Sequence, residues 1–158
     1  MSVVLCRVDD RLIHGQVVVG WGQALKLERI VLADDEVARS DWEQDLYRMA
    51  VPAEFEVVFA TVAAAASRLA EWAGDAQRTA VLVGSIDAAA QLYHAAPVVA
   101  RHINLGGIHH RPGRTERLPY VYLTDEEQRQ LQRLEGEGAQ ITGQDVPTSA
   151  PVPLEALG

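Results

Sequence analysis

His14 follows a short run of charged residues that could handle a phosphoryl group. The segment Asp9–Val17 reads Asp-Asp-Arg-Leu-Ile-His-Gly-Gln-Val and opens a stretch of helical spacing. Backbone N–H groups at a helix N-terminus have no intrahelical partner, and with the helix dipole they favour an anion. Gly15 lets a phosphate approach the backbone, and Arg11 can fork onto phosphate oxygens. The pattern predicts nucleophilic catalysis by His14 with electrostatic support; a capping or packing role for His14 fits the spacing equally well.

Two pairs of carboxylates lie at the ends of predicted strands. Asp9 and Asp10 follow the first apolar run, and as hard oxygen donors they resemble a pair of Mg²⁺ ligands. We favour a different role, in which one of them orients Arg11 or the loop through hydrogen bonds. Asp34 and Asp35 end the second predicted strand and fit a turn, since aspartate side chains hydrogen-bond to nearby backbone groups.

A histidine and arginine cluster follows the fifth predicted strand. His109 and His110 precede Arg111 and Arg114, and with His102 they invite a metal-site interpretation. The spacing matches no known ligand pattern and no cysteine or carboxylate completes it, so we predict no metal and no other cofactor. We expect His109 to support a phosphate site. Arg111 and Arg114 are candidates for neutralising phosphate or contacting a partner. The alternative is that both simply lie on a loop exposed to solvent.

The composition argues against several classes of partner. The 158 residues carry a formal net charge of −8, which disfavours nucleic acids and anionic membranes. The glycine-rich patterns that cradle nucleotides are absent. No apolar run approaches a membrane span, and the N-terminal residues have the pattern of a strand rather than a signal peptide, so we expect a cytoplasmic protein. The single cysteine, Cys6, fits a buried structural thiol.

Short apolar runs alternate with stretches of helical spacing along the chain. Strands are predicted over Ser2–Val8, Glu28–Leu32, Phe55–Phe59, Thr79–Val83, His102–Leu105, Thr115–Leu118, Tyr120–Leu123 and Ala139–Thr142, and helices over Gly15–Leu27, Asp41–Val51, Val62–Ala73, Ile86–Ala95 and Asp125–Glu135. This alternation predicts an α/β fold with a mainly parallel central sheet, helices on both faces in a doubly wound arrangement, and an antiparallel piece near the C-terminus. We expect one domain over 1–147 and a loosely ordered tail over 148–158. Trp21, Trp42 and Trp72 are expected to pack in the core or an interface.

Ligands bind beyond the carboxyl ends of the strands in such a sheet. This rule selects loops at Asp9–His14, Ala33–Glu36, Ala60-Thr61, Gly84-Ser85 and Gly106–Arg114.

The first loop resembles the phosphorylation-site signature of one protein family. Asp9–Val17 is similar to the corresponding segment of the IIB components of the mannose/fructose/sorbose family of the sugar phosphotransferase system (PTS). Further similar segments occur in family order across nearly all of Ser2–Pro147: Ala33–Ala38, Met49–Pro52, Asn104–His109 and Asp145–Pro147.

The resemblance implies a protein-Nπ-phosphohistidine–sugar phosphotransferase. Members take a phosphoryl group from a phosphohistidine on the IIA protein, hold it on the pros nitrogen of the histidine matching His14, and pass it to a sugar in the membrane IIC and IID subunits. Residues matching Arg11, Gly15 and Gln16 are expected to hold the phosphate, without a metal. The family sheet places Gly106–Arg114 beside the first loop, and members often form homodimers.

The chain departs from the family pattern in the glycine-rich loop. Ile108 stands where methionine is usual, and Gly113-Arg114 stands where a Gly-Lys pair is usual. Neither change touches His14 or Arg11. A regulatory phosphocarrier, whose partners read the phosphorylation of His14, is the alternative to sugar transfer. A small α/β hydrolase that uses His14 as a base would need a nucleophile that the sequence does not show.

Overall fold

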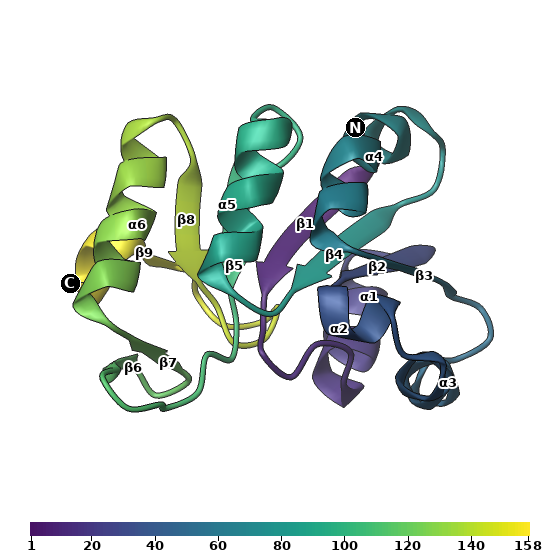
Figure 1. Cartoon of the computed structure of the whole chain (residues 1–158), viewed down its shortest axis with the longest axis horizontal. Helices are drawn as coiled ribbons and strands as arrows, with labels where there is room; N and C mark the ends of the chain where they lie inside the picture. Colours follow the sequence, from purple (N-terminus) through teal and green to yellow (C-terminus); the bar gives the residue numbers. More distant parts are fainter.

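The fold is built around a seven-stranded sheet whose strands are parallel except for one edge strand. The structure, a computed structural model, describes residues 1–158 apart from the side chain of Gln16. The strand order is β3-β2-β4-β1-β5-β8-β9, and β6 and β7 form a separate antiparallel pair (Figure 1). The strands are β1 (Val3–Val8), β2 (Arg29–Ala33), β3 (Glu56–Ala60), β4 (Thr79–Val83), β5 (His102–Leu105), β6 (Thr115–Leu118), β7 (Val121–Leu123), β8 (Gln140–Gly143) and β9 (Val152–Pro153).

The helices lie on both faces of the sheet, so the predicted doubly wound α/β fold is confirmed. They are η1 (Gln16–Trp21), α1 (Gly22–Ala24), α2 (Asp35–Ala38), α3 (Asp41–Ala50), α4 (Val62–Gly74), α5 (Ile86–Ala95), α6 (Asp125–Gly136) and η2 (Leu154–Leu157). Figure 1 shows α4, α5 and α6 side by side on one face. The alternation of side chains in β4 explains the two cores: Val81 and Val83 pack with these helices, while Ala80 and Leu82 pack with the cluster formed by η1.

Side-chain caps fix where the longer helices begin. Thr61 accepts a hydrogen bond from the N–H of Ala64, and Ser85 does the same for Ala88. A capping box begins α6, where Thr124 and Glu127 each accept from the other's backbone N–H.

The first helix has a different pitch from the one expected. The sequence predicts an α-helix over Gly15–Leu27, whereas η1 is a π-helix that passes into the short α1. Val17, Val18 and Trp21 are buried, and Trp21 thus takes the core position of its two expected ones. Their spacing fits one side of either helix type, so the apolar pattern does not distinguish the two. Such wide turns occur frequently at functional sites.

The C-terminal tail is packed against the sheet, in contrast to the expected loose order over 148–158. Val152–Pro153 pairs with β8 as an antiparallel edge strand, a position that tolerates proline because its N–H side is unpaired. Leu154 and Leu157 are then buried in the core. A second difference is α2, a short helix capped by Asp34, in place of the expected turn.

Candidate active site

The loop that carries His14 leaves the carboxyl end of β1, at the centre of the sheet. β1 lies between β4 and β5, and its loop is joined to both. The N–H of Asp9 donates to the carbonyl of Val83, and the N–H of Asp10 donates to the carbonyl of Gly107. The glycine-rich loop after β5 therefore lies beside the first loop, as the family resemblance implied.

The carboxylate of Asp9 is fully buried and binds the two residues expected to handle phosphate. Its Oδ1 accepts from the backbone N–H of Arg11 and from Nε of the same residue, each at 3.0 Å, and its Oδ2 accepts from Nη2 of Arg11 at 2.9 Å. Oδ2 also lies 3.1 Å from Nε2 of His14. Asp9 thus takes the orienting role that the sequence left open between the two carboxylates.

The charge state of Asp9 determines which nitrogen of His14 carries the proton. Burial by itself raises the pKa of Asp9, but hydrogen bonds from His14 and Arg11 outweigh burial and hold that pKa below its ordinary value. An ionised carboxylate only accepts hydrogen bonds, so Nε2 of His14 must be the donor. In a neutral imidazole the lone pair is then on Nδ1. Nδ1 has no hydrogen-bond partner among the residues that the structure describes.

Arg7 supports Asp9 from inside the protein. It is 1% exposed, and its Nη2 lies 3.5 Å from Oδ2 of Asp9. Its guanidinium donates to Oδ1 of Asn104 and to the carbonyls of Gln144 and Asp145, and it lies over the ring of Trp21. Arg7 therefore ties the ends of β1, β5 and β8 together behind the carboxylate.

The two glycines after β5 make room for these arginines. A Cβ at Gly106 would lie 2.4 Å from Nη2 of Arg7, and a Cβ at Gly107 would lie 3.0 Å from Nε of Arg11. Real Cβ atoms do not approach other atoms as closely as the first of these distances. The Gly106-Gly107 pair is thus explained by the close approach of arginine side chains rather than by a nucleotide.

Contacts between the two loops involve other predicted site residues. Asp10 accepts from the backbone N–H of His109 at 2.8 Å and lies 2.5 Å from Nδ1 of the same residue. Arg114 forks onto the carboxylate of Glu127, at 3.0 and 2.9 Å, and donates to the carbonyl of His109. Asp10, His109 and Arg114 therefore hold the loop after β5 in place.

The remaining predicted residues lie around His14 or at its edge. Gly15 is exposed and precedes η1, which has no side-chain cap at its N-terminus. The side chain of Gln16 lies outside the described residues. Arg111 is exposed and lines a hollow beside the loop. Leu12 has a positive φ of 60°, a conformation that a leucine keeps only when its surroundings fix it.

Sequence reasoning did not identify Arg7 and Asn104. Arg7 stands inside an apolar strand, and a charged residue in such a run is seldom buried without a partner. That mismatch was the available signal for Arg7. Asn104 gave no comparable signal, because its role depends on the pairing of β5 with β1.

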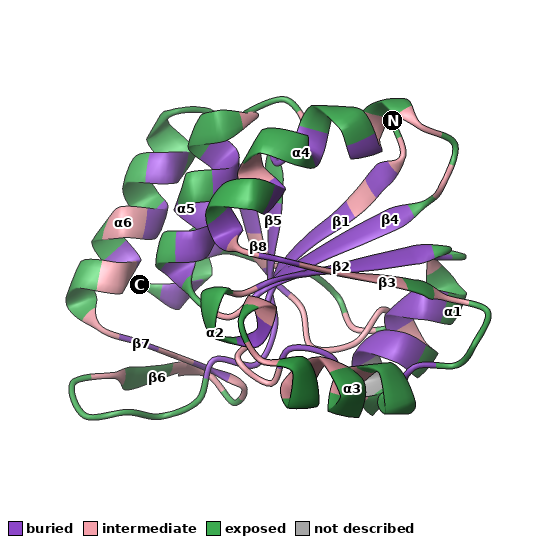
Figure 2. Cartoon of the chain, turned by 45° about the vertical axis from the view of Figure 1, so that its right-hand side comes forward, coloured by how far each residue is buried: buried purple, intermediate pink, exposed green. Residues whose placement is uncertain are grey.

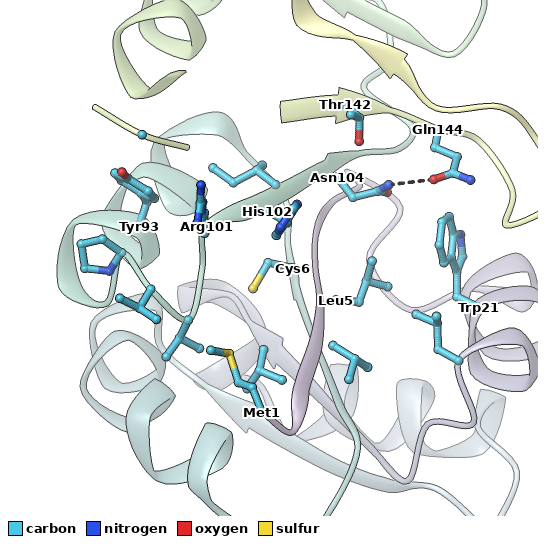
Figure 3. A pocket seen from close by; sticks show the side chains of 18 residues that line it. Met1, Leu5, Cys6, Trp21, Tyr93, Arg101, His102, Asn104, Thr142 and Gln144 are labelled. Carbon is cyan, nitrogen blue, oxygen red and sulfur yellow. Dashed lines mark hydrogen bonds between the residues drawn. The ribbon is translucent and has the colours of Figure 1, made fainter. Parts of the chain in front are cut away.

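A separate hollow of about 790 Å³ lies over β1, β5 and β8, and His14 is not among its lining residues. Figure 3 shows Asn104 and Gln144 at one side of it, joined by a hydrogen bond of 3.4 Å. Both residues also contact Arg7, through the Asn104 side chain and the Gln144 carbonyl. This hollow therefore lies beside the residues that hold Arg7, and His14 does not line it.

The described residues contain neither a cluster of metal-binding side chains nor a helix that could span a membrane. No group of three or more His, Cys, Asp or Glu side chains is placed to hold a metal ion. Likewise, none of the described helices is both long enough and apolar enough to cross a membrane.

Comparison with known proteins gives full-length matches. A family model described as "PTS system sorbose subfamily IIB component" matches residues 3–157. The N-acetylgalactosamine-specific phosphotransferase enzyme IIB component 2 of Escherichia coli (strain K12) is 30% identical over 156 residues, 99% of this chain and 98% of the relative.

Solved structures share the fold. The crystal structure of the PTS N-acetylgalactosamine-specific IIB component 1 from Escherichia coli matches with a TM-score of 0.86 and 25% identity, over 95% of this chain and 97% of that one. An N-acetyl-galactosamine IIB component from Streptococcus pyogenes matches with a TM-score of 0.89, over 98% of this chain and 96% of that one. At 21% identity, the second match concerns the fold alone.

Proposed function

Because the chain belongs to the sorbose subfamily of PTS IIB components, we propose that Nδ1 of His14 accepts a phosphoryl group from a phosphorylated IIA protein. The chain then passes this group to a sugar held by the membrane subunits IIC and IID. The observation that carries the proposal is the contact between Asp9 and Nε2 of His14, which directs the lone pair of the ring to Nδ1.

The transfer is a displacement at phosphorus. The lone pair of His14 Nδ1 forms the new N–P bond while the P–N bond to the donor histidine breaks, and the electron pair of that bond returns to the donor ring. The proton on Nε2 of His14 stays in its hydrogen bond to Asp9. The positive charge that the imidazole gains on bonding to phosphorus is balanced by this buried carboxylate. In the second step the sugar hydroxyl attacks phosphorus, His14 leaves as a neutral imidazole, and the hydroxyl proton passes to solvent.

The surroundings of Nδ1 favour a bound phosphoryl group. The side chain of Arg11 is 33% exposed, and its Nη2 and Nε2 of His14 both contact Oδ2 of Asp9, so a guanidinium able to bind phosphate oxygens lies close to the His14 ring. The first backbone N–H groups of η1 follow directly after His14, and such groups bind anions. We therefore propose Arg11 and the backbone at Gly15 and Gln16 as the phosphate-binding groups. The expected cytoplasmic location stays a prediction.

The test uses two phosphoryl donors. Wild type and His14→Ala are incubated with labelled phosphoenolpyruvate, enzyme I, the HPr phosphocarrier and a IIA protein, and in parallel with phosphoramidate, a small chemical donor. We expect acid-labile, base-stable label on the wild type alone, and NMR of the product should show phosphorus on Nδ1. Absence of label from a IIA protein known to be charged would overturn the proposal; phosphorus on Nε2 would overturn the assigned nitrogen.

The sugar is tested next with membranes that contain IIC and IID. Full-length relatives are named for N-acetylgalactosamine and for fructose, so these sugars are the first acceptors to try. We expect labelled protein to lose its phosphoryl group to a sugar in the presence of these membranes. If the label persists with every sugar tried, the transport role is wrong and the regulatory phosphocarrier remains.

A further inference from the structure

Helix α3 carries an apolar stripe that faces the solvent. Trp42, Leu46 and Met49 follow the spacing i, i+4, i+7 and so lie on one side of the helix. Their exposed fractions are 68%, 54% and 83%, and no residue of α3 is buried. Figure 2 shows the helix mostly exposed along its length. Of the two expectations for Trp42, the core position is therefore wrong.

The other side of α3 fixes its orientation. The side-chain amide of Gln44 donates to the carbonyls of Val37 and Ala38, and the ring of Tyr47 packs against Phe59 with centroids 6.5 Å apart. The helix is thus attached through Gln44 and Tyr47, and the stripe on its other side is mostly exposed. Tryptophan and methionine are enriched at protein interfaces, and truncation of a central tryptophan commonly has a large effect on binding.

An acidic hollow lies between helix α3 and the His14 loop. It has a volume of about 520 Å³ and reaches from Asp10 and Leu12 in the loop to Glu43 and Tyr47 on α3. Its charged lining residues are Asp10, Asp34, Asp35, Glu36, Glu43 and Asp87 against Arg39 and Arg111, six carboxylates and two guanidinium groups. A partner that spans the stripe and reaches His14 must therefore present basic side chains to this hollow.

We propose that the stripe of α3 and the acidic hollow together dock the phosphorylated IIA protein. The inference rests on the proposed function, because it names the surface that brings the donor to His14. The chemistry selects a protein with an apolar centre and a rim of lysine or arginine. An anionic bilayer does not fit, since the net charge of −8 and the acidic hollow repel it. A second copy fits poorly as well, because it has the same net charge of −8 and does not supply the basic surface that the acidic hollow calls for.

The experiment compares two donors on one pair of variants. Trp42→Ala/Leu46→Ala removes the stripe. Val98→Ala is the matched control, since Val98 is 75% exposed but precedes β5 and so lies at the amino ends of the strands, away from the His14 loop. We expect the double variant to lose about tenfold or more in kcat/KM for transfer from phosphorylated IIA, and to keep the wild-type rate with phosphoramidate. Val98→Ala should match the wild type with both donors.

Several outcomes would overturn the inference. Equal loss with both donors would mean that the substitutions act on His14 itself, and no loss with IIA would mean that the stripe is not used. A normal rate from IIA combined with slower transfer to sugar would assign the surface to the membrane subunits. A change in sedimentation of the double variant would assign it to a second copy. Failure of the wild type with every donor would instead contradict the proposed function.

The charges are tested separately with Glu36→Gln/Glu43→Gln. Opposite charges raise association rates, and salt weakens this effect. We expect slower transfer from IIA at low salt, a shallower dependence on salt concentration, and an unchanged rate with phosphoramidate. A salt dependence identical to that of the wild type would contradict the proposed role of the hollow.

Discussion

The His14 loop follows the carboxyl end of β1, and helix α3 follows β2 and α2, but different contacts determine the two regions. In the loop, the buried carboxylate of Asp9 contacts Arg11, His14 and Arg7, so both of its oxygens already have partners within the chain. Helix α3 has no buried residue and leaves its apolar side in water. A reacting group must be held in one geometry before its substrate arrives, whereas a docking surface can wait for its partner to cover it. Substitutions in the loop should therefore affect both the phosphorylation of His14 and the stability of the fold. Substitutions in the exposed stripe of α3 should change neither the stability nor the reaction of His14 with a small chemical donor.

The largest effect is expected from Asp9→Asn. Asparagine has no negative charge to keep the proton on Nε2 or to balance a positively charged ring, and loss of such an orienting carboxylate costs orders of magnitude in other enzymes. We expect the rate of His14 phosphorylation by phosphoramidate to fall about 10³-fold.

The control for this variant is Asp10→Asn, which changes the neighbouring carboxylate that binds His109. Its rate should stay close to that of the wild type. A rate for Asp9→Asn within tenfold of the wild type would mean that Asp9 does not determine the reactive nitrogen.

Arg7→Leu should give the largest loss of stability. The substitution leaves Asp9 buried with one guanidinium fewer, and breaking a buried ion pair typically costs about 3–5 kcal/mol. Urea denaturation measures the free energy of unfolding. Arg129→Leu is the comparison, because Arg129 pairs with Glu126 at the surface, where a pair contributes about 0–1 kcal/mol. Equal losses for the two variants would show that Arg7 is not part of a buried network.

Gly106→Ala should destabilise the protein by about 1–3 kcal/mol, because the added methyl group displaces the Arg7 guanidinium. It should also slow phosphorylation, since Arg7 supports Asp9. Gly136→Ala is the matched control: a Cβ there meets nothing within 4 Å, and the residue ends α6. That variant should be neutral or slightly more stable. Retained stability in Gly106→Ala would contradict the close approach of Arg7.

The pKa of Asp9 predicts a pH dependence of stability. Its folded-state pKa lies below the value of about 3.9 for the unfolded chain. The ionised carboxylate therefore stabilises the native state above about pH 4, and this contribution is lost as the pH falls toward the folded-state pKa. The difference in unfolding free energy between wild type and Asp9→Asn should be greatest near neutral pH and shrink below about pH 4. A constant difference across that range would mean that Asp9 is not ionised at neutral pH.

The smallest effect is expected on α3. Trp42→Ala/Leu46→Ala removes side chains that are 68% and 54% exposed, so its free energy of unfolding should lie within about 0.5 kcal/mol of the wild type. A loss of several kcal/mol would show that the stripe is part of the fold, and would remove the contrast with the His14 loop.

Several elements were predicted at their observed bounds from local pattern. Thr79–Val83, Ile86–Ala95 and His102–Leu105 match β4, α5 and β5, because buried parallel strands are continuous apolar runs and Ser85 caps the helix between two of them. The elements that were missed depend on distant partners. Residues 152–157 form a short segment that includes Pro153 and gives little local signal. They are ordered because Val152 and Pro153 pair with β8 and because Leu154 and Leu157 are buried in the core.

The candidate site divides in the same way. His14, Arg11 and Asp9 were identified from one short motif, since the residues that we propose to react and to bind phosphate are neighbours in the chain. The carboxylate that orients Arg11 was left open between two candidates, and Arg7 was not considered. Both were decided by contacts between β1 and the loops after β5 and β8, up to 138 positions away in the chain.

By itself, the sequence determined the α/β order of elements and the residue types that can carry a phosphoryl group, because periodicity, capping and motif spacing are local properties. The family resemblance implied the pros nitrogen of His14, and only the tertiary structure decided what leaves the lone pair of the ring on that nitrogen. It is left there by the Asp9 carboxylate, which hydrogen bonds from His14 and Arg11 keep ionised in spite of its burial, with two glycines after β5 leaving room for Arg7 and Arg11. Only the tertiary structure also decided that Trp42 faces water while Trp21 and Trp72 are buried, since all three lie on helices and differ in what the sheet brings against them.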